Sequence, residues 1–141
     1  MTYDDNNIFA KILRGEASAF KVYETESSLA FLDVMPQSDG HTLVLPKTPA
    51  RDLFDLDENM AGSLIQSVQH VARAVNTAFE PDGIRLMQFN GSAAGQTVFH
   101  IHVHIVPCYE NQEMHRHAKG MQESEVLEQH AEKIRAALEL I

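Results

Sequence analysis

This sequence lacks several features that mark secreted and membrane-bound proteins. Its single cysteine, Cys108, cannot form a disulfide bond within the chain. No apolar run reaches the ~20 residues that a membrane-spanning helix needs. The first residues, Met-Thr-Tyr-Asp-Asp, lack the basic and apolar regions of a signal peptide. We therefore expect a protein of the reducing cytoplasm that has no membrane partner.

Positive charge is also scarce. The chain has 11 lysines and arginines against 20 aspartates and glutamates, a formal net charge of −9, which argues against a nucleic-acid partner. Between Asp82 and Glu110, however, there is no carboxylate, and Arg85 is the only formally charged residue. An anionic ligand would meet the least repulsion in this acid-free stretch.

The length and composition fit one domain. With 141 residues, 44% of them hydrophobic, the chain can bury a core without metal or disulfide bonds. No internal repeat, low-complexity tract or linker divides it, so we expect a single domain over residues 1–141.

Hydrophobic periodicity predicts an α+β fold. The clearest helix has apolar residues at every third or fourth position from Met60 to Phe79 and begins after Asp57, a good N-cap residue. Helices are predicted over 7–14, 57–79 and from about 123 onwards, and strands over 20–23, 29–34, 41–45, 84–89 and 98–106. Short links between the first three strands favour antiparallel pairing. The expected fold is a five-stranded antiparallel sheet with a long central helix, an N-terminal helix and a C-terminal helix.

Three histidines alternate with apolar residues in the last predicted strand, in the sequence His100-Ile101-His102-Val103-His104. Because successive side chains of a strand point to opposite faces, the imidazoles are expected to share one face, about 6.6 Å from one another along the strand. The apolar residues between them are expected to face the core. Such a row suits a polyphosphate or two ligands to one metal ion.

The residues alone leave three interpretations of this strand open. The histidines could be unrelated surface residues, or two of them could hold zinc, for which His-x-His on a strand is a good geometry. The flanking stretch, however, has neither a carboxylate nor a second cysteine. The preceding Gly95-Gln96-Thr97 favours phosphate chemistry instead, because glycine admits a ligand close to the backbone, exposed amides bind anions, and both polar side chains can donate hydrogen bonds. Neutral imidazole is a competent nucleophile. We therefore predict neither a metal nor a cofactor.

This stretch resembles the histidine triad (HIT) family, whose signature is His-φ-His-φ-His-φ-φ with φ apolar. Residues 100–106 match the signature completely. Residues 95–99 are similar to the run that precedes it in the family, and residues 8–12, 29–33, 36–37 and 40–47 look like the family's N-terminal helix and earlier strands. The resemblance covers roughly residues 7–107 and is closest to the Hint branch and its bacterial relatives. It leaves residues 109–141 as a divergent C-terminal extension.

The resemblance implies a role for each matching residue. His102 matches the nucleophile, which forms a nucleotidyl-histidine intermediate that water hydrolyses. His100 matches the histidine that orients the nucleophile, and His104 and His41 match histidines around the α-phosphate. The other matches are phosphate-binding Gln96, Thr97 and Asn90, ribose-binding Asp33, and a base pocket of Phe9, Phe31, Leu32 and Val34. The family also forms twofold homodimers that join two five-stranded sheets.

Some positions depart from the family pattern. The loop at Asn90 is one residue shorter than in animal Hint proteins, so an ungapped alignment would place Phe89 at the site asparagine; we assign Asn90 on chemical grounds. Leu32 stands where some relatives have histidine. His104 replaces the glutamine of the uridylyltransferase branch, which favours hydrolysis over transfer. One cysteine cannot supply the cysteine-rich zinc site of some bacterial relatives.

The expected function is hydrolysis of a purine nucleotide at its α-phosphorus, with a nucleoside phosphoramidate as the typical substrate. Three alternatives stay open: a dinucleoside polyphosphate hydrolase, a nucleotide-binding regulatory protein whose catalysis is incidental, and a metal-binding protein. Separately, His115 and His117 form a pair that could bind a metal ion weakly and adventitiously.

Overall fold

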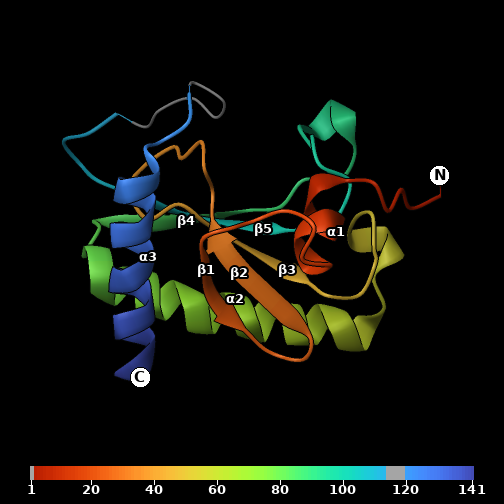
Figure 1. Ribbon diagram of the computed structural model, residues 1–141, viewed down its shortest axis with the longest axis horizontal. Coiled ribbons are helices and arrows are strands. Elements are labelled where there is room, and N and C mark those ends of the chain that lie inside the picture. The colour runs from red at the N-terminus through yellow and green to blue at the C-terminus, as the bar shows by residue number, and fades with distance from the viewer. Residues whose placement is uncertain (1, 114–119) are drawn as a thin grey trace.

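The computed structural model of the protein describes residues 2–113 and 120–141 (Figure 1). His115 and His117 lie outside the described residues. The helices are α1 (Ile8–Leu13), α2 (Glu58–Phe79) and α3 (Ser124–Glu139), with short 3-10 turns at Leu53–Asp55 and Ser92–Ala94. The strands are β1 (Lys21–Glu24), β2 (Ser28–Leu32), β3 (Thr42–Pro46), β4 (Gly83–Met87) and β5 (Val103–Cys108). No helix in the described part of the chain is long and apolar enough to cross a membrane.

The five strands form one antiparallel sheet in the order β1-β2-β3-β5-β4. The connection through α2 carries the chain from β3 to β4 at the far edge, and β5 then returns between them. The predicted α+β fold, with a five-stranded antiparallel sheet and three helices, is confirmed.

The two faces of the sheet are covered by different helices. α2 lies across one face, with α3 packed against α2 and β1 (Figure 1). On this side Ala30 and Val44 of the sheet join the larger apolar core. On the other face α1 packs against Leu29 and Phe31 of β2, in a smaller apolar cluster. Because both faces are covered, β2 and β3 are buried along their whole length instead of alternating with solvent.

The long helix follows its sequence signals closely. Asp57 caps its N-terminus by accepting a hydrogen bond from the backbone N–H of Met60 at 2.9 Å. The apolar positions Leu64, Val68, Val71 and Val75 are all buried. Burial of this stripe fixes the rotation of α2 on the sheet.

The histidine strand begins later than predicted. β5 starts at Val103, not Val98, because β3 pairs with it only between Val103 and Ile105. Residues 98–102 run outside the regular ladder, held in part by a 2.9 Å bond from the N–H of Ile101 to the carbonyl of Ala50. At the other end, Pro107 continues the strand instead of ending it. The Pro107 carbonyl accepts a hydrogen bond from the Ser38 hydroxyl, on the edge of β5 that faces β3. Pairing with β3 has already ended at Ile105, so the N–H that proline lacks is not needed for a bond between the strands.

Gly40 gives a stability prediction. It adopts φ +92°, and a Cβ there would lie 2.8 Å from a ring carbon of Phe79, whose ring also packs against His130. Gly40→Ala should therefore lower the free energy of unfolding by about 2 kcal/mol, through backbone strain and overpacking. Gly62→Ala in α2 is the matched control, because nothing lies within 4 Å of its Cβ position, and alanine should stabilise a helix by about 0.5–1 kcal/mol. Urea unfolding of the wild type and of both variants measures these effects. Equal unfolding midpoints for Gly40→Ala and the wild type would contradict this interpretation of Gly40.

Candidate functional site

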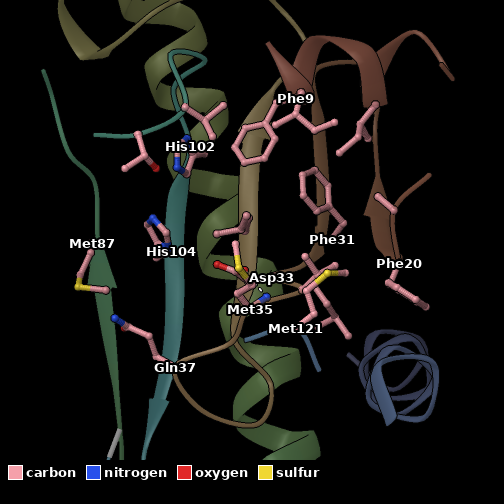
Figure 2. Close-up of a pocket in the computed structure, with 18 of the residues that line it drawn as sticks. Phe9, Phe20, Phe31, Asp33, Met35, Gln37, Met87, His102, His104 and Met121 are labelled. Atoms are coloured by element: carbon pink, nitrogen blue, oxygen red, sulfur yellow. Dashed lines mark hydrogen bonds between the residues drawn. The ribbon is translucent and has the colours of Figure 1, made fainter. Parts of the chain in front are cut away.

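A cavity of about 710 Å³ opens on the α1 face of the sheet. It is bounded by α1, the end of β2 and the turn after it, β4, the segment before β5, and the start of α3 (Figure 2). Its size suits a mononucleotide-sized ligand. Among the described residues of its lining, Asp33 is the only carboxylate, and none is a lysine or an arginine.

The three signature histidines divide into two roles. His102 and His104 line the cavity, with ring centroids 5.1 Å apart. His100 is fully buried and is not part of the lining. The expectation of three imidazoles in a row is therefore corrected, because residues 98–102 lie outside the regular strand and do not keep its spacing.

The nucleophile candidate has a defined proton position. His102 Nδ1 lies 2.7 Å from the carbonyl oxygen of His100. A carbonyl only accepts, so Nδ1 carries the proton and the lone pair of the neutral ring is on Nε2. The Phe9 ring meets the His102 ring edge-on, with centroids 4.8 Å apart, and limits its rotation.

His104 is held by a chain of hydrogen bonds that starts at the backbone. The N–H of Gln37 donates to His41 Nδ1 at 3.0 Å, so a neutral His41 carries its proton on Nε2. His41 Nε2 lies 2.9 Å from His104 Nδ1 and donates to it. His104 then carries its own proton on Nε2, which makes that nitrogen a hydrogen-bond donor.

Asp33 adjoins the same chain. Its Oδ1 accepts the backbone N–H of Met35 at 2.9 Å, and its Oδ2 lies 3.5 Å from His41 Nε2. Each of Asp33, His41 and His104 offers one atom that could ligate a metal ion, and these three atoms lie within 4.8 Å of one another. Carboxylate oxygen and imidazole nitrogen are both ligands that zinc accepts. The sequence argument against metal was the lack of a nearby carboxylate. The fold supplies one from the end of β2, so that argument does not apply in three dimensions.

The expected base pocket is assembled as a single apolar wall. Phe9, Phe31, Leu32 and Val34 all line the cavity. Phe9 and Phe31 meet edge to face with centroids 5.4 Å apart, a favourable arrangement for aromatic rings. Figure 2 shows these two rings on one side of His102 and His104, with Met87 on the other.

Sequence reasoning missed part of this lining. Phe20, Met35 and Met121 extend the apolar wall, and Met87 lies on the opposite side (Figure 2). Phe89 also lines the cavity, beside His104. Met121 belongs to the divergent C-terminal segment, which is anchored by a 2.9 Å bond from the N–H of Gln122 to the carbonyl of Val34. No local pattern marked these residues, because the sheet order brings them together.

Two expected phosphate ligands are corrected. Gln96 is buried in its own loop: its Oε1 accepts the N–H of Gly91, and its Nε2 donates to the carbonyls of Arg51 and Val98. Both amide hydrogens are thus already committed. The backbone N–H groups of Gly95 and Gln96 also donate within the loop, to the carbonyls of residues 92 and 91, so they form no anion-binding nest. Thr97 is the member of Gly95-Gln96-Thr97 whose side chain can serve the cavity.

Asn90 is the second correction. Its side chain pairs with that of Gln88 and accepts the backbone N–H of Leu53 at 2.8 Å, which ties two loops together outside the cavity lining. Phe89 lines the cavity instead, with its ring centroid 5.6 Å from that of His104. The residue that lines the cavity in this loop is therefore Phe89, the one that an ungapped alignment would place there, and not Asn90.

The remaining described histidines have structural surroundings. His70 on α2 packs against Tyr23, and His130 on α3 packs against Phe79. Partial burial lowers the pKa of His130. Neither residue lines the cavity.

Comparison with known proteins identifies the family. The HIT domain model matches residues 14–111. The chain is 44% identical to Protein hit of Bacillus subtilis over 105 residues, which cover 74% of this chain and 72% of that protein. It is 36% identical to adenylylsulfatase HINT3 of Arabidopsis thaliana over 106 residues, 75% of this chain and 54% of that protein. The crystal structure of a Hit-like protein from Bartonella henselae, involved in cell-cycle regulation, superimposes with a TM-score of 0.92 and 47% identity over 97% of this chain and 99% of that one. The chain belongs to the HIT domain family.

Proposed function

We propose that this protein hydrolyses purine nucleotides at the α-phosphorus through a nucleotidyl-histidine intermediate on His102, with nucleoside phosphoramidates as the preferred substrates. The observation that carries the proposal is the bond from His102 Nδ1 to the carbonyl of His100. It fixes the lone pair on Nε2 of a ring that lines the cavity. The Arabidopsis relative named as an adenylylsulfatase supports chemistry at an adenylyl group.

The proposed reaction has two displacements. His102 Nε2 attacks the α-phosphorus and forms a P–N bond, while the bond to the leaving group breaks and its electron pair departs with that group. A phosphoramidate leaves as an amine once its nitrogen is protonated, and the Thr97 hydroxyl lines the cavity where it can relay that proton. Water then attacks the same phosphorus and loses one proton to the solvent, which balances the proton taken up by the amine. The P–N bond to His102 breaks, its electron pair returns to Nε2, and the nucleoside monophosphate leaves the neutral histidine.

His104 is proposed to stabilise charge on the phosphoryl oxygens. The chain from Gln37 through His41 places its proton on Nε2, as a donor. Such a preorganised donor matters most where water is excluded. Asp33 is proposed to accept the ribose hydroxyls, since it is the carboxylate of the lining and lies next to the base wall.

The lining also favours a particular leaving group. On the side opposite Phe9 and Phe31 it offers Met87 (Figure 2), and Phe89 lines it next to His104. No described lining residue is a lysine or an arginine. A chain of further phosphates would bring negative charge to a wall without compensating cations. The cavity therefore suits an uncharged amine better than the second half of a dinucleoside polyphosphate.

Detection of the covalent intermediate tests this proposal. The protein is mixed with adenosine phosphoramidate, guanosine phosphoramidate, adenylyl sulfate or diadenosine polyphosphate. Each reaction is quenched in base, and the intact mass of the protein is measured by mass spectrometry. We expect a nucleotidyl adduct and turnover with the phosphoramidates, and the slowest turnover with the dinucleotide. Tight nucleotide binding without adduct or turnover on any substrate would favour a regulatory nucleotide-binding protein instead.

The protein is further proposed to be a homodimer. In the part of the chain that the structure describes, β4 is an edge strand that pairs only with β5, and its Leu86 is 51% exposed. An unprotected edge strand with an exposed apolar side chain favours pairing with a second copy. Light scattering should give the mass of a dimer for the wild type and of a monomer for Leu86→Glu, with Ile65→Glu, an exposed position on α2, for comparison. A monomeric wild type would reject the dimer.

A further inference from the structure

The segment that carries the nucleophile is not held by the sheet. Residues 98–102 precede β5, so the carbonyl of His100, which accepts the His102 proton, does not lie in a strand ladder. Its peptide group is held by the bond from the N–H of Ile101 to the carbonyl of Ala50 and by the contacts of the His100 residue itself. The His100 side chain is fully buried, which makes its hydrogen-bond partners decisive.

Both ring nitrogens of His100 have partners from distant parts of the chain. Nε2 lies 2.7 Å from the carbonyl oxygen of Pro46 at the end of β3 and must donate to it. Nδ1 lies 2.7 Å from the phenol oxygen of Tyr3. With Nε2 donating to Pro46, Nδ1 of the neutral ring carries the lone pair and accepts the Tyr3 hydroxyl. Burial lowers the pKa of His100, which favours this neutral form.

Tyr3 is itself fixed from the N-terminal helix. The Nδ2 of Asn7 donates to the Tyr3 oxygen at 3.0 Å, while Asn7 Oδ1 caps α1 by accepting the N–H of Ala10. The same helix carries Phe9, which contacts the His102 ring. The N-terminal segment, which precedes the matched HIT domain at residue 14, therefore touches both His100 and His102.

We propose that Tyr3 is a positioning residue for the nucleophile. Its hydroxyl donates to Nδ1 of the Nε2–H tautomer of His100, so the ring is clamped between the N-terminal segment and β3. The clamp helps to fix the His100 carbonyl, and that carbonyl fixes the His102 proton on Nδ1. Tyr3 touches neither the cavity nor the substrate and acts only through His100. This inference rests on the proposed role of His102, but its spectroscopic test needs no turnover.

The test compares Tyr3→Phe with Tyr23→Phe in the full-length protein. Both changes remove one phenol hydroxyl, and Tyr23 packs against His70 away from the cavity. With adenosine phosphoramidate, Tyr3→Phe should lower kcat about tenfold, the order expected for one buried acceptor left unpaired. KM should stay within about twofold, because no substrate contact is lost. Tyr23→Phe should leave both unchanged.

Long-range ¹H–¹⁵N NMR spectra of the ligand-free proteins supply the second readout. The wild type and Tyr23→Phe should show His100 as the Nε2–H tautomer and a protected proton on His102 Nδ1. In Tyr3→Phe the Nδ1 lone pair of His100 loses its donor, so its ¹⁵N shift should move toward that of an unbonded nitrogen while Nε2–H stays bound to Pro46. The His102 proton should exchange faster with water.

The outcomes separate the possibilities. Unchanged kcat and histidine spectra in Tyr3→Phe would overturn the inference, and so would a lower melting temperature alone, which would make Tyr3 merely structural. If no protein turns over any nucleotide but Tyr3→Phe still alters the His102 signal, the positioning contact stands and the proposed function fails.

Discussion

Replacing His102 with alanine should abolish hydrolysis, with kcat lower by roughly 10⁴-fold or more and no nucleotidyl adduct. The ring that supplies the lone pair is lost, and the neighbouring imidazoles cannot replace it. His104 Nδ1 is committed to His41, and His100 is buried outside the cavity lining. Nucleotide binding should persist, because the base wall of Phe9 and Phe31 is untouched.

Steady-state rates and calorimetric binding of a nucleoside monophosphate measure the two effects separately. His70→Ala is the control, since that histidine lies on α2, packs against Tyr23 and does not line the cavity. Normal turnover by His102→Ala on every nucleotide tested would reject His102 as nucleophile. Loss of binding together with loss of turnover would mean that the cavity had collapsed, and His102→Gly would then repeat the test with imidazole added to restore the rate.

Replacing His104 with alanine should lower kcat by about 10²–10³-fold, the range for removal of one preorganised donor to a developing negative charge. The nucleophile remains, so the adduct should still form, but slowly. KM should change much less than kcat, because the donor contributes most when charge builds up on the phosphoryl oxygens.

Steady-state rates and the single-turnover rate of adduct formation together measure the effect of replacing His104. His130→Ala serves as control, since His130, on α3, packs against Phe79 and does not line the cavity. If His104→Ala raises KM alone, His104 contributes only uniform binding, and its proposed role in the transition state is wrong.

The two expected losses differ in kind because the two rings differ in proton position. His102 has its proton on Nδ1, and His104 has its proton on Nε2. One ring is prepared to give an electron pair and its neighbour to give a hydrogen bond. Neither assignment follows from the alternating histidine pattern, in which the three imidazoles are equivalent. Each follows from a partner that the fold supplies.

Local patterns determined the framework of this protein. The apolar stripe from Leu64 to Val75, the Asp57 cap and the short links between the first strands were enough for the α+β class and the antiparallel sheet. The run of histidines placed the site at His102 and His104. Periodicity, capping and turn signals act over a few residues, so they can be read directly from the chain.

The strand boundary and two site residues were not readable in this way. The sequence pattern extends the histidine strand back to Val98, but pairing with β3 starts only at Val103. Gln96 and Asn90 carry the right chemistry for phosphate, but their amides are used to hold loops together. Residue type shows what a side chain can bind, and only the surrounding backbone decides what it does bind.

The arrangement of the site was decided by tertiary structure. Asp33 and His41 meet at the end of β2, His41 reaches His104 across 63 positions of sequence, and Tyr3 reaches His100 across 97. These contacts depend on the sheet order β1-β2-β3-β5-β4, which brings β3 beside β5. The sequence by itself indicated which histidines are candidates for chemistry. The tertiary structure decided which nitrogen of each carries the proton, because the hydrogen-bond partners that fix the protons come from distant segments.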